Sequence, residues 1–322
     1  MTALYPLILQ PVFKERIWGG RQLASFYGPS LPPGPIGEAW VLGEHDQGMS
    51  VVANGPLSGR GLGDLRREYG PALLGSRGDA SPTGRCPLLI KLLDAQDDLS
   101  VQVHPADDYA GLPPGEPGKT EMWYILDAQP GAKIVYGLKD GMDAGAFAAA
   151  VRDGQILDAL RTVEVQAGDV FYVPAGTIHA LGRGTLVAEL QQSSDTVYRV
   201  YDYDRPGLDG KPRELHVAHA LQVARYDTPA EAFRPGEPPA NRWQLLVDSP
   251  FFLVHRGTVE EAWMQRVSPG SFDALLVLAG QGSITWDGGD ERLKAGDSVL
   301  VPACLSHYEL SGSLKVLRSR VP

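Results

Sequence analysis

The side chains best suited to chemistry in this sequence are those of Gln102, His104, Glu121 and His179. Two imidazole nitrogens, a carboxylate and an amide oxygen suit Zn²⁺, and they leave a coordination position open for water or substrate. Glu121 begins an apolar run, where a buried carboxylate requires a partner. Each residue also has a simpler interpretation. A lone histidine in a strand is often structural, and Gln102 would serve equally well as a hydrogen-bond partner of a neighbour.

A strand expected at residues 99–104 gives two of these side chains a common direction. Apolar and polar residues alternate strictly from Leu99 to His104. Ser100, Gln102 and His104 therefore share one face of the strand. Polar residues directed into a common interior indicate a site rather than a core.

A turn, a short strand and a second turn precede the other histidine. The pattern Gly168-x5-Pro174-x-Gly176-x2-His179 resembles the second signature of the cupin superfamily, whose jelly-roll barrels are built from antiparallel strands. Gly168 turns the chain into the strand and the segment Pro174 to Gly176 ends it, which aims His179 into the barrel. The Gln-x-His pair and the glutamate described above take the place of the first cupin signature.

With this set assembled, four segments resemble class I mannose-6-phosphate isomerase (phosphomannose isomerase) in its shorter bacterial form. The resemblance covers the chain from residue 11 to about residue 220, and residues 41–46 depart from the pattern usual in the family. The order and spacing of the segments are specific. The four segments are Pro11–Gly20, Pro87–Pro105, Gly118–Tyr124 and Gln191–Tyr203.

The resemblance implies one zinc ion per chain, held by Gln102, His104, Glu121 and His179. It also implies a catalytic arginine at Arg199 and interconversion of mannose 6-phosphate and fructose 6-phosphate. Moving the carbonyl from C1 to C2 requires ring opening, removal of a C–H proton to give a cis-enediol, and return of a proton at the neighbouring carbon. Zinc and an arginine are both able to stabilise the developing oxyanion.

Further polar residues are candidates for binding and proton transfer. Lys119 lies two residues before the glutamate ligand and shares its strand face, so we expect it to assist ring opening or to bind substrate; the alternative is a solvated lysine. Glu189 is the candidate base, and its alternative role is an ion pair with an arginine. Ser100 is a candidate for binding the substrate or its phosphate. The loop cations Arg205 and Lys211 are weaker candidates for the phosphate.

The pattern of the whole chain predicts a mainly β protein with two cupin-type jelly-roll barrels and a few inserted or appended helices. The segment 167–179 reappears as 295–307 at an offset of 128, and the strand that begins at Glu121 resembles the one that begins at Asp273 at an offset of 152. We expect a catalytic domain at 1–235 and a degenerate cupin domain without metal at 236–322, in which His307 is structural. Helices are expected within 61–75, 141–161 and 213–225.

Composition excludes several classes of protein. The 322 residues include 29 Lys and Arg against 39 Asp and Glu, a formal charge of −10, and no basic run suited to nucleic acid is present. No apolar run approaches the roughly 20 residues that span a bilayer. With only two cysteines, a reducing cytoplasm is the default expectation. We expect a small hexose phosphate as partner, no membrane or nucleic acid, and a monomer or homodimer.

Two alternative functions remain open at this point. Two histidines and a carboxylate also form the triad of Fe²⁺-dependent cupin dioxygenases, although Gln102, Lys119 and Arg199 favour an anionic sugar over an apolar substrate. A non-catalytic sugar-binding cupin would need neither the intact metal set nor an interior arginine.

Overall fold

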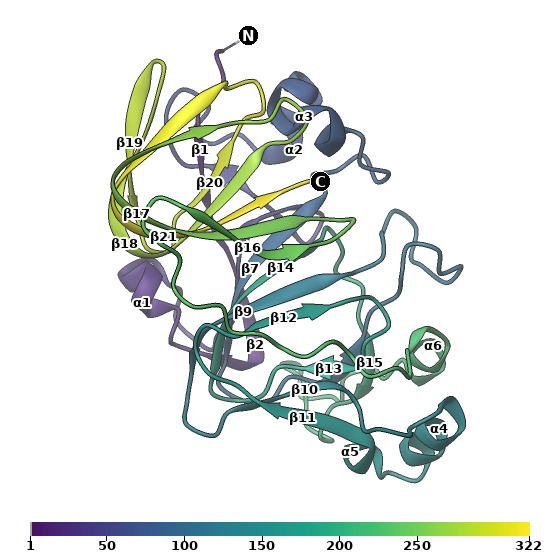
Figure 1. The fold of residues 1–322 in the computed structure, drawn as a ribbon. Coiled ribbons are helices and arrows are strands. Elements are labelled where there is room, and N and C mark those ends of the chain that lie inside the picture. The colour runs from purple at the N-terminus through teal and green to yellow at the C-terminus, as the bar shows by residue number, and fades with distance from the viewer. Residues whose placement is uncertain (1) are drawn as a thin grey trace.

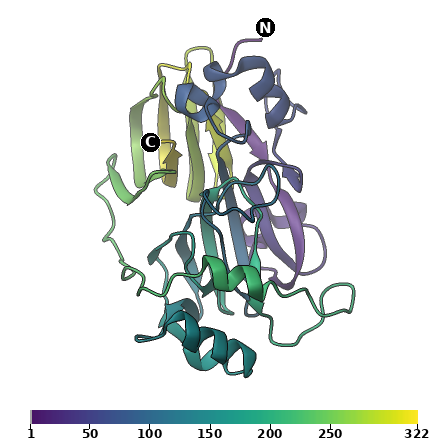
Figure 2. The same ribbon diagram turned by 90° about the vertical axis from the view of Figure 1, so that its right-hand side faces the viewer.

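The computed structural model describes residues 2–322, and its strands pair antiparallel in three large sheets and one small one (Figure 1). The mainly β class predicted from the turn-rich sequence is confirmed. Figure 2 shows the teal helices of residues 144–159 at one end of the molecule, and the yellow-green strands near the C-terminus together with the blue helices of residues 62–79 at the other. Within residues 2–322, no helix combines the length and apolar character that a membrane crossing requires.

Two facing sheets form the part of the molecule that contains the expected site. Their facing sides enclose a buried cluster that includes Trp123, Ile134 and Phe171. The six-stranded sheet has the order β12 (Val170–Val173), β9 (Glu121–Ala128), β14 (Thr185–Gln192), β7 (Leu88–Ala95), β2 (Val12–Gly20) and β3 (Ile36–Leu42). The five-stranded sheet has the order β11 (Leu160–Glu164), β10 (Lys133–Leu138), β13 (His179–Ala180), β8 (Val101–Val103) and β15 (Tyr198–Tyr201).

The third sheet, here called the C-terminal sheet, curls around its own buried core, because Val259, Leu275, Val299 and Val316 from four of its strands form one cluster. Two strands from the N-terminal part of the chain, β1 and β6, pair at one edge of this sheet. The sheet therefore contains strands from both ends of the sequence. Its order is β16 (Trp243–Asp248), β17 (Leu253–Arg266), β21 (His307–Arg320), β18 (Asp273–Trp286), β20 (Ser298–Val301), β1 (Leu7–Gln10) and β6 (Val51–Val52), with β19 (Gly289–Lys294) beside β18. The separate small sheet pairs β4 (Glu44–His45) with β5 (Gly48–Met49).

The helices are shorter than their sequence patterns predicted. The single helix expected within 61–75 is wrong, because Gly70 has a φ of +49° and separates α2 (Leu62–Tyr69) from α3 (Pro71–Asp79). The helix expected within 141–161 is likewise divided, and its last residues already belong to β11. The remaining helical segments are α1 (Ala24–Tyr27), the 3₁₀ turn η1 (Gly28–Ser30), α4 (Ala144–Arg152), α5 (Ile156–Ala159) and α6 (Val217–Val223).

The helices α4, α5 and α6 cover the outer face of the five-stranded sheet (Figure 1). Phe147, Ile156 and Ala220 supply one buried residue from each helix to the cluster on that face. On the other side, Leu92 and Met122 of the six-stranded sheet pack with Leu276 of the C-terminal sheet. The two site-bearing sheets are therefore packed from both outer sides.

Gly176 allows the turn that leads into His179 to pack closely against the end of α6. Its φ is +87°, and a Cβ atom there would lie 2.6 Å from Cγ of Arg225 and 2.8 Å from the carbonyl oxygen of Val223. Its N–H donates to the carbonyl of His104 at 2.8 Å. One glycine therefore ties together the turns that carry both histidines.

We expect Gly176→Ala to lower the free energy of unfolding by about 3 kcal/mol, since it combines left-handed backbone strain with a steric clash. Urea unfolding of the purified protein measures this loss. Gly131→Ala is the matched control, because Gly131 has a φ of +77° and no atom within 4 Å of the added Cβ, so about 1 kcal/mol is expected. If both variants lose the same free energy of unfolding, the close contact between Gly176 and α6 does not contribute to stability.

Candidate metal centre and active-site cavity

Strands from the two facing sheets bring the expected histidines and glutamate together. His104 follows β8 and His179 begins β13, both in the five-stranded sheet, while Glu121 begins β9 in the sheet opposite. Nε2 of His104 lies 3.4 Å from one carboxylate oxygen of Glu121, and Nε2 of His179 lies 3.3 Å from the other. All three side chains are at most 1% exposed. The three residues thus form a convergent, buried group.

Backbone carbonyls fix which nitrogen of each imidazole carries the proton. Nδ1 of His104 lies 2.8 Å from the carbonyl oxygen of Thr196, and Nδ1 of His179 lies 2.8 Å from that of Thr177. A carbonyl only accepts, so each Nδ1–H donates and each Nε2 carries a lone pair directed toward the glutamate. This is the orientation that metal-binding histidines require.

The charge balance of this group also fits a bound cation. Neither carboxylate oxygen of Glu121 accepts a hydrogen bond of regular geometry within residues 2–322, although Nζ of Lys119 lies 3.0 Å from one of them. Burial raises the pKa of Glu121 to about 7, with Lys119 acting against that rise. Burial lowers the pKa of His179 to about 4, so this imidazole is neutral at pH 7. Two lone pairs and an unsatisfied carboxylate at one buried point are a donor set for a divalent metal.

Gln102 lies beside this group in the same sheet. The register places it between His179 on β13 and Arg199 on β15. Its amide nitrogen lies 3.3 Å from Nε2 of His179. The contact is the hydrogen bond that the simpler sequence interpretation expects.

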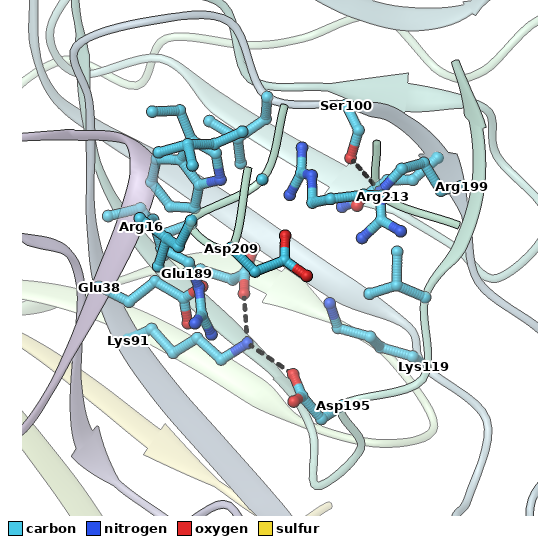
Figure 3. A pocket seen from close by; sticks show the side chains of 18 residues that line it. Arg16, Glu38, Lys91, Ser100, Lys119, Glu189, Asp195, Arg199, Asp209 and Arg213 are labelled. Carbon is cyan, nitrogen blue, oxygen red and sulfur yellow. Dashed lines mark hydrogen bonds and ion pairs between the residues drawn. The ribbon is translucent and has the colours of Figure 1, made fainter. Parts of the chain in front are cut away.

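A cavity of about 590 Å³ opens beside the metal-ligand group (Figure 3). Its volume is in the range of sites for small ligands. Ser100, Arg199 and Arg213 gather at one end of it, and Lys91 and Glu189 lie at the other (Figure 3). The charged side chains that line it are Arg16, Glu38, Lys91, Lys119, Glu189, Asp195, Arg199, Asp209 and Arg213.

The arginine end of the cavity is held by contacts to neighbouring loops. Nε of Arg199 donates to the hydroxyl of Ser100 at 3.3 Å, and Nη1 donates to the carbonyl of Glu214 at 2.8 Å. Arg213 donates from Nε to Asp202 at 2.6 Å. Asp202 also pairs with Arg205, and Asp209 lines the same cavity, so arginines and aspartates alternate at this end.

Glu189 lies in a row of paired residues across the six-stranded sheet, between Trp123 on β9 and Lys91 on β7. Nε1 of Trp123 donates to one of its carboxylate oxygens at 3.0 Å, and Nζ of Lys91 lies 3.4 Å from the other. The arginine partner expected as the alternative role is wrong, because the cation is a lysine. Burial raises the pKa of Glu189, but Lys119 and Lys91 outweigh it and hold that pKa below its ordinary value.

Lys119 extends into the same cavity from the residues just before β9. Its Nζ lies 3.1 Å from Nε2 of His104, and its side chain is only 4% exposed. The alternative of a solvated surface lysine is therefore wrong. Burial lowers the pKa of Lys119, but Glu121 and Glu189 raise it more, so the ammonium form persists at neutral pH.

Comparison with known proteins agrees with this geometry. Residues 7–123 match the family model described as phosphomannose isomerase type I, catalytic domain, and residues 243–321 match the mannose-6-phosphate isomerase cupin domain. A mannose-6-phosphate isomerase of Streptococcus mutans is 39% identical over 98% of both chains. This chain belongs to the type I phosphomannose isomerase family.

Other members support the assignment across the whole chain. The mannose-6-phosphate isomerase ManA of Bacillus subtilis is 38% identical over 98% of this chain and 99% of its own length. A crystal structure of the mannose 6-phosphate isomerase from Bacillus subtilis superimposes with a TM-score of 0.86 at 35% identity, covering 98% of this chain and 99% of that one. The cupin-domain match covers most of the C-terminal sheet.

Two polar residues of the cavity, Lys91 and Glu38, were not predicted from the sequence. Both lie on the side of the cavity opposite Arg199 and Arg213. Lys91 stands in the apolar run 88–93, and its signal was a charge inside a buried strand. Glu38 is a buried acid within the all-buried strand β3. By contrast, Arg205 is not among the residues that line the cavity within 2–322, because it pairs with Asp202 and Asp97.

Glu38 gives the isomerase-family fold a pH-dependent contribution to stability. Its carboxylate accepts hydrogen bonds from Nε of Arg16 and Nε1 of Trp40, each at 2.6 Å. Burial opposes ionisation, but Lys91 and Arg16 outweigh it and lower the pKa of Glu38 from 4.5 to about 2. A depressed folded-state pKa contributes stability above the unfolded pKa, and this contribution is lost as the pH falls from 4.5 through 2.

We expect Glu38→Gln to lower the free energy of unfolding at pH 7 by about 3 kcal/mol, the equivalent of this pKa difference. The difference from the unmodified protein should narrow as the pH falls toward 2. Urea unfolding at a series of pH values measures it, and exposed Glu164→Gln is the control. A difference that stays constant between pH 5 and pH 2 would contradict the assigned electrostatic origin.

Proposed function

We propose that this chain is a zinc-dependent aldose–ketose isomerase that interconverts mannose 6-phosphate and fructose 6-phosphate through a cis-enediol. The observation that carries the proposal is the convergence of two unprotonated imidazole nitrogens and a buried carboxylate beside a cavity that two arginines also line. Its relatives from Streptococcus mutans and Bacillus subtilis are named mannose-6-phosphate isomerases, which supports the proposal.

One zinc ion per chain is proposed to be held by His104, Glu121 and His179, with the amide of Gln102 as a fourth donor. Bound there, zinc supplies a Lewis-acidic positive charge for the substrate oxygens at C1 and C2. The carbonyls of Thr177 and Thr196 accept from the Nδ1–H groups and so hold the ligand imidazoles in place.

The phosphate dianion is proposed to bind at the arginine end of the cavity. Arg199 and Arg213 are planar fork donors suited to phosphate oxygens, and the hydroxyl of Ser100 adds a donor beside them. Anchoring the phosphate there directs the sugar carbons toward the ligand imidazoles and Glu189. Arg199 pairs with Gln102, which itself pairs with the ligand His179, so its fixed positive charge would also act on the enediolate.

Proton transfer between C2 and C1 is assigned to Glu189. Its lowered pKa keeps the carboxylate ionised at neutral pH, ready to accept the C2 proton. In a cis-enediol both carbons present the same face to one base, so the carboxylic acid formed is able to return the proton to C1. The indole N–H of Trp123 holds one carboxylate oxygen in place, and the ammonium of Lys91 lies 3.4 Å from the other, which is the oxygen proposed to accept the proton.

Lys119 is proposed to donate hydrogen bonds to the substrate oxygens during ring opening. It keeps its proton because two carboxylates surround it. Its position next to His104 and Glu121 places it at the metal end of the cavity, away from the arginines proposed for the phosphate.

We propose that the N-terminal and C-terminal parts of the chain have different functions. All residues assigned to zinc and substrate lie within 1–235, the proposed catalytic domain, and 236–322 is the proposed degenerate cupin domain. The strands β1 and β6 nevertheless complete the C-terminal sheet. His307, the repeat counterpart of His179, is 38% exposed and lies 3.4 Å from Asp287.

Assay of the purified protein for fructose 6-phosphate formation from mannose 6-phosphate tests the proposal, alongside elemental analysis. We expect turnover with one zinc per chain, loss of turnover after chelation, and recovery when zinc is added back. Sugar binding without turnover in the zinc-loaded protein would favour a non-catalytic cupin. Iron in place of zinc together with oxygen uptake would favour a dioxygenase.

We expect Arg199→Ala to reduce turnover by on the order of 10³-fold, because a charge that stabilises the transition state is removed. Zinc content should stay near one per chain, since Arg199 contributes no proposed ligand. Arg152→Ala, which removes an exposed arginine of α4, is the control and should retain full activity. Loss of zinc from the Arg199 variant would assign this residue a structural role instead.

A further inference from the structure

The C-terminal sheet repeats the strand register of the six-stranded sheet. In the six-stranded sheet, Glu121 on β9 pairs with Val173 on β12. In the C-terminal sheet, Asp273 on β18 pairs with Val301 on β20. The second pair follows the first at the sequence offsets of 152 and 128 that relate the two repeats. Asp273 therefore occupies the position of the metal-ligand glutamate.

The correspondence continues on the neighbouring strands. Glu189 pairs with Trp123, and Arg318 pairs with Leu275, which stands 152 residues after Trp123. Arg318 thus takes the place of the proposed catalytic base. On the next strand, His255 pairs with Arg318 at the position where a lysine pairs with Glu189. The positions of two acids and a lysine in the six-stranded sheet are therefore occupied by an aspartate, an arginine and a histidine in the C-terminal sheet.

The charges of this second set do not balance. Both carboxylate oxygens of Asp273 are engaged, by the hydroxyl of Tyr308 at 2.9 Å and by the guanidinium of Arg320. Arg318 is 6% exposed, and no carboxylate of residues 2–322 lies within 4.0 Å of it. Its Nε has no hydrogen-bond partner in the described chain. Two guanidinium groups and one carboxylate leave a net positive charge.

His255 does not change this balance. Burial, Arg318 and Arg320 lower its pKa to about 4, so the imidazole is neutral at pH 7. Its Nδ1 is buried and, within residues 2–322, lacks a hydrogen-bond partner. Two neighbouring side chains of this face therefore each hold a buried polar nitrogen with unused hydrogen-bonding capacity.

Two tryptophans fix the orientation of the arginine. The guanidinium of Arg318 stacks on Trp243, with its carbon 4.1 Å from the ring centroid. Trp243 in turn packs on Trp263 with centroids 4.5 Å apart, and Nε1 of Trp243 donates to Gln265 at 2.7 Å. Gly257 provides the room, because a Cβ there would approach both rings within 3.0 Å. The stack covers one face of the guanidinium and leaves its N–H edges for an acceptor.

We propose that the inner face of the C-terminal sheet binds one small oxyanion, a phosphate or a carboxylate group, on the guanidinium of Arg318. A buried guanidinium with an unsatisfied N–H and no carboxylate in direct contact is costly, and an oxyanion accepting from its N–H edge removes that cost. The unused imidazole of His255 and the hydroxyl of Tyr308 lie on the same face. This site is separate from the proposed isomerase site and does not depend on that function.

Calorimetric titration of zinc-loaded protein with inorganic phosphate tests the proposal. The Arg199→Ala background weakens phosphate binding at the isomerase cavity. In that background we expect one phosphate per chain to remain bound, and a further Arg318→Gln substitution to weaken it at least tenfold. Titration with acetate in the same background distinguishes a phosphate site from a carboxylate site. Absence of binding by both anions, or undiminished binding in the Arg318→Gln protein, would overturn the proposal.

Arg318→Lys in the same background keeps the charge and provides a second variant if the glutamine protein does not fold. We expect three- to tenfold weaker binding of the preferred anion, because the two-pronged donor edge is lost. Unchanged affinity would contradict recognition by the guanidinium. Isomerase turnover of the single Arg318→Gln variant, with Arg199 intact, reports on folding and should match that of the unmodified protein.

Discussion

One buried carboxylate lies at the centre of the proposed metal site. Glu121 lies between two sheets, with both oxygens turned toward imidazole nitrogens that carry lone pairs rather than protons. Such a group is unfavourable without a cation, since a carboxylate and two lone pairs at one point repel one another. A divalent ion at that point would link the five-stranded sheet to the six-stranded sheet, so the proposed cofactor is structural as well as chemical.

Beside this carboxylate, a chain of net charge −10 has a cavity that is proposed to accept an anion. Two acids close to the proposed metal, Glu189 and Glu121, are matched by Lys91 and Lys119. In another part of the cavity, Arg213 donates to Asp202, and Arg199 donates to Ser100. These side chains lie in different parts of the cavity. We therefore expect the reacting carbons to bind near the lysines and Glu189, and the phosphate to bind near the arginines.

Local sequence patterns predicted the parts of the site that depend on local geometry. Period-two alternation placed Ser100, Gln102 and His104 on one face, and the turn before His179 set its direction, because both effects act within a few residues. Pairing across sheets leaves no such local signal. The position of β1 in the C-terminal sheet and the lysine partner of Glu189 were therefore missed, and the break at Gly70 was hidden by continuous apolar spacing.

X-ray absorption at the zinc edge of the protein as purified tests whether a metal ion is bound at Glu121. We expect one zinc per chain with light-atom ligands only, two of them imidazoles, and loss of this signal from the Glu121→Ala protein. Absence of zinc, or a shell containing sulfur from Cys86 or Cys304, would contradict a metal centre built on Glu121.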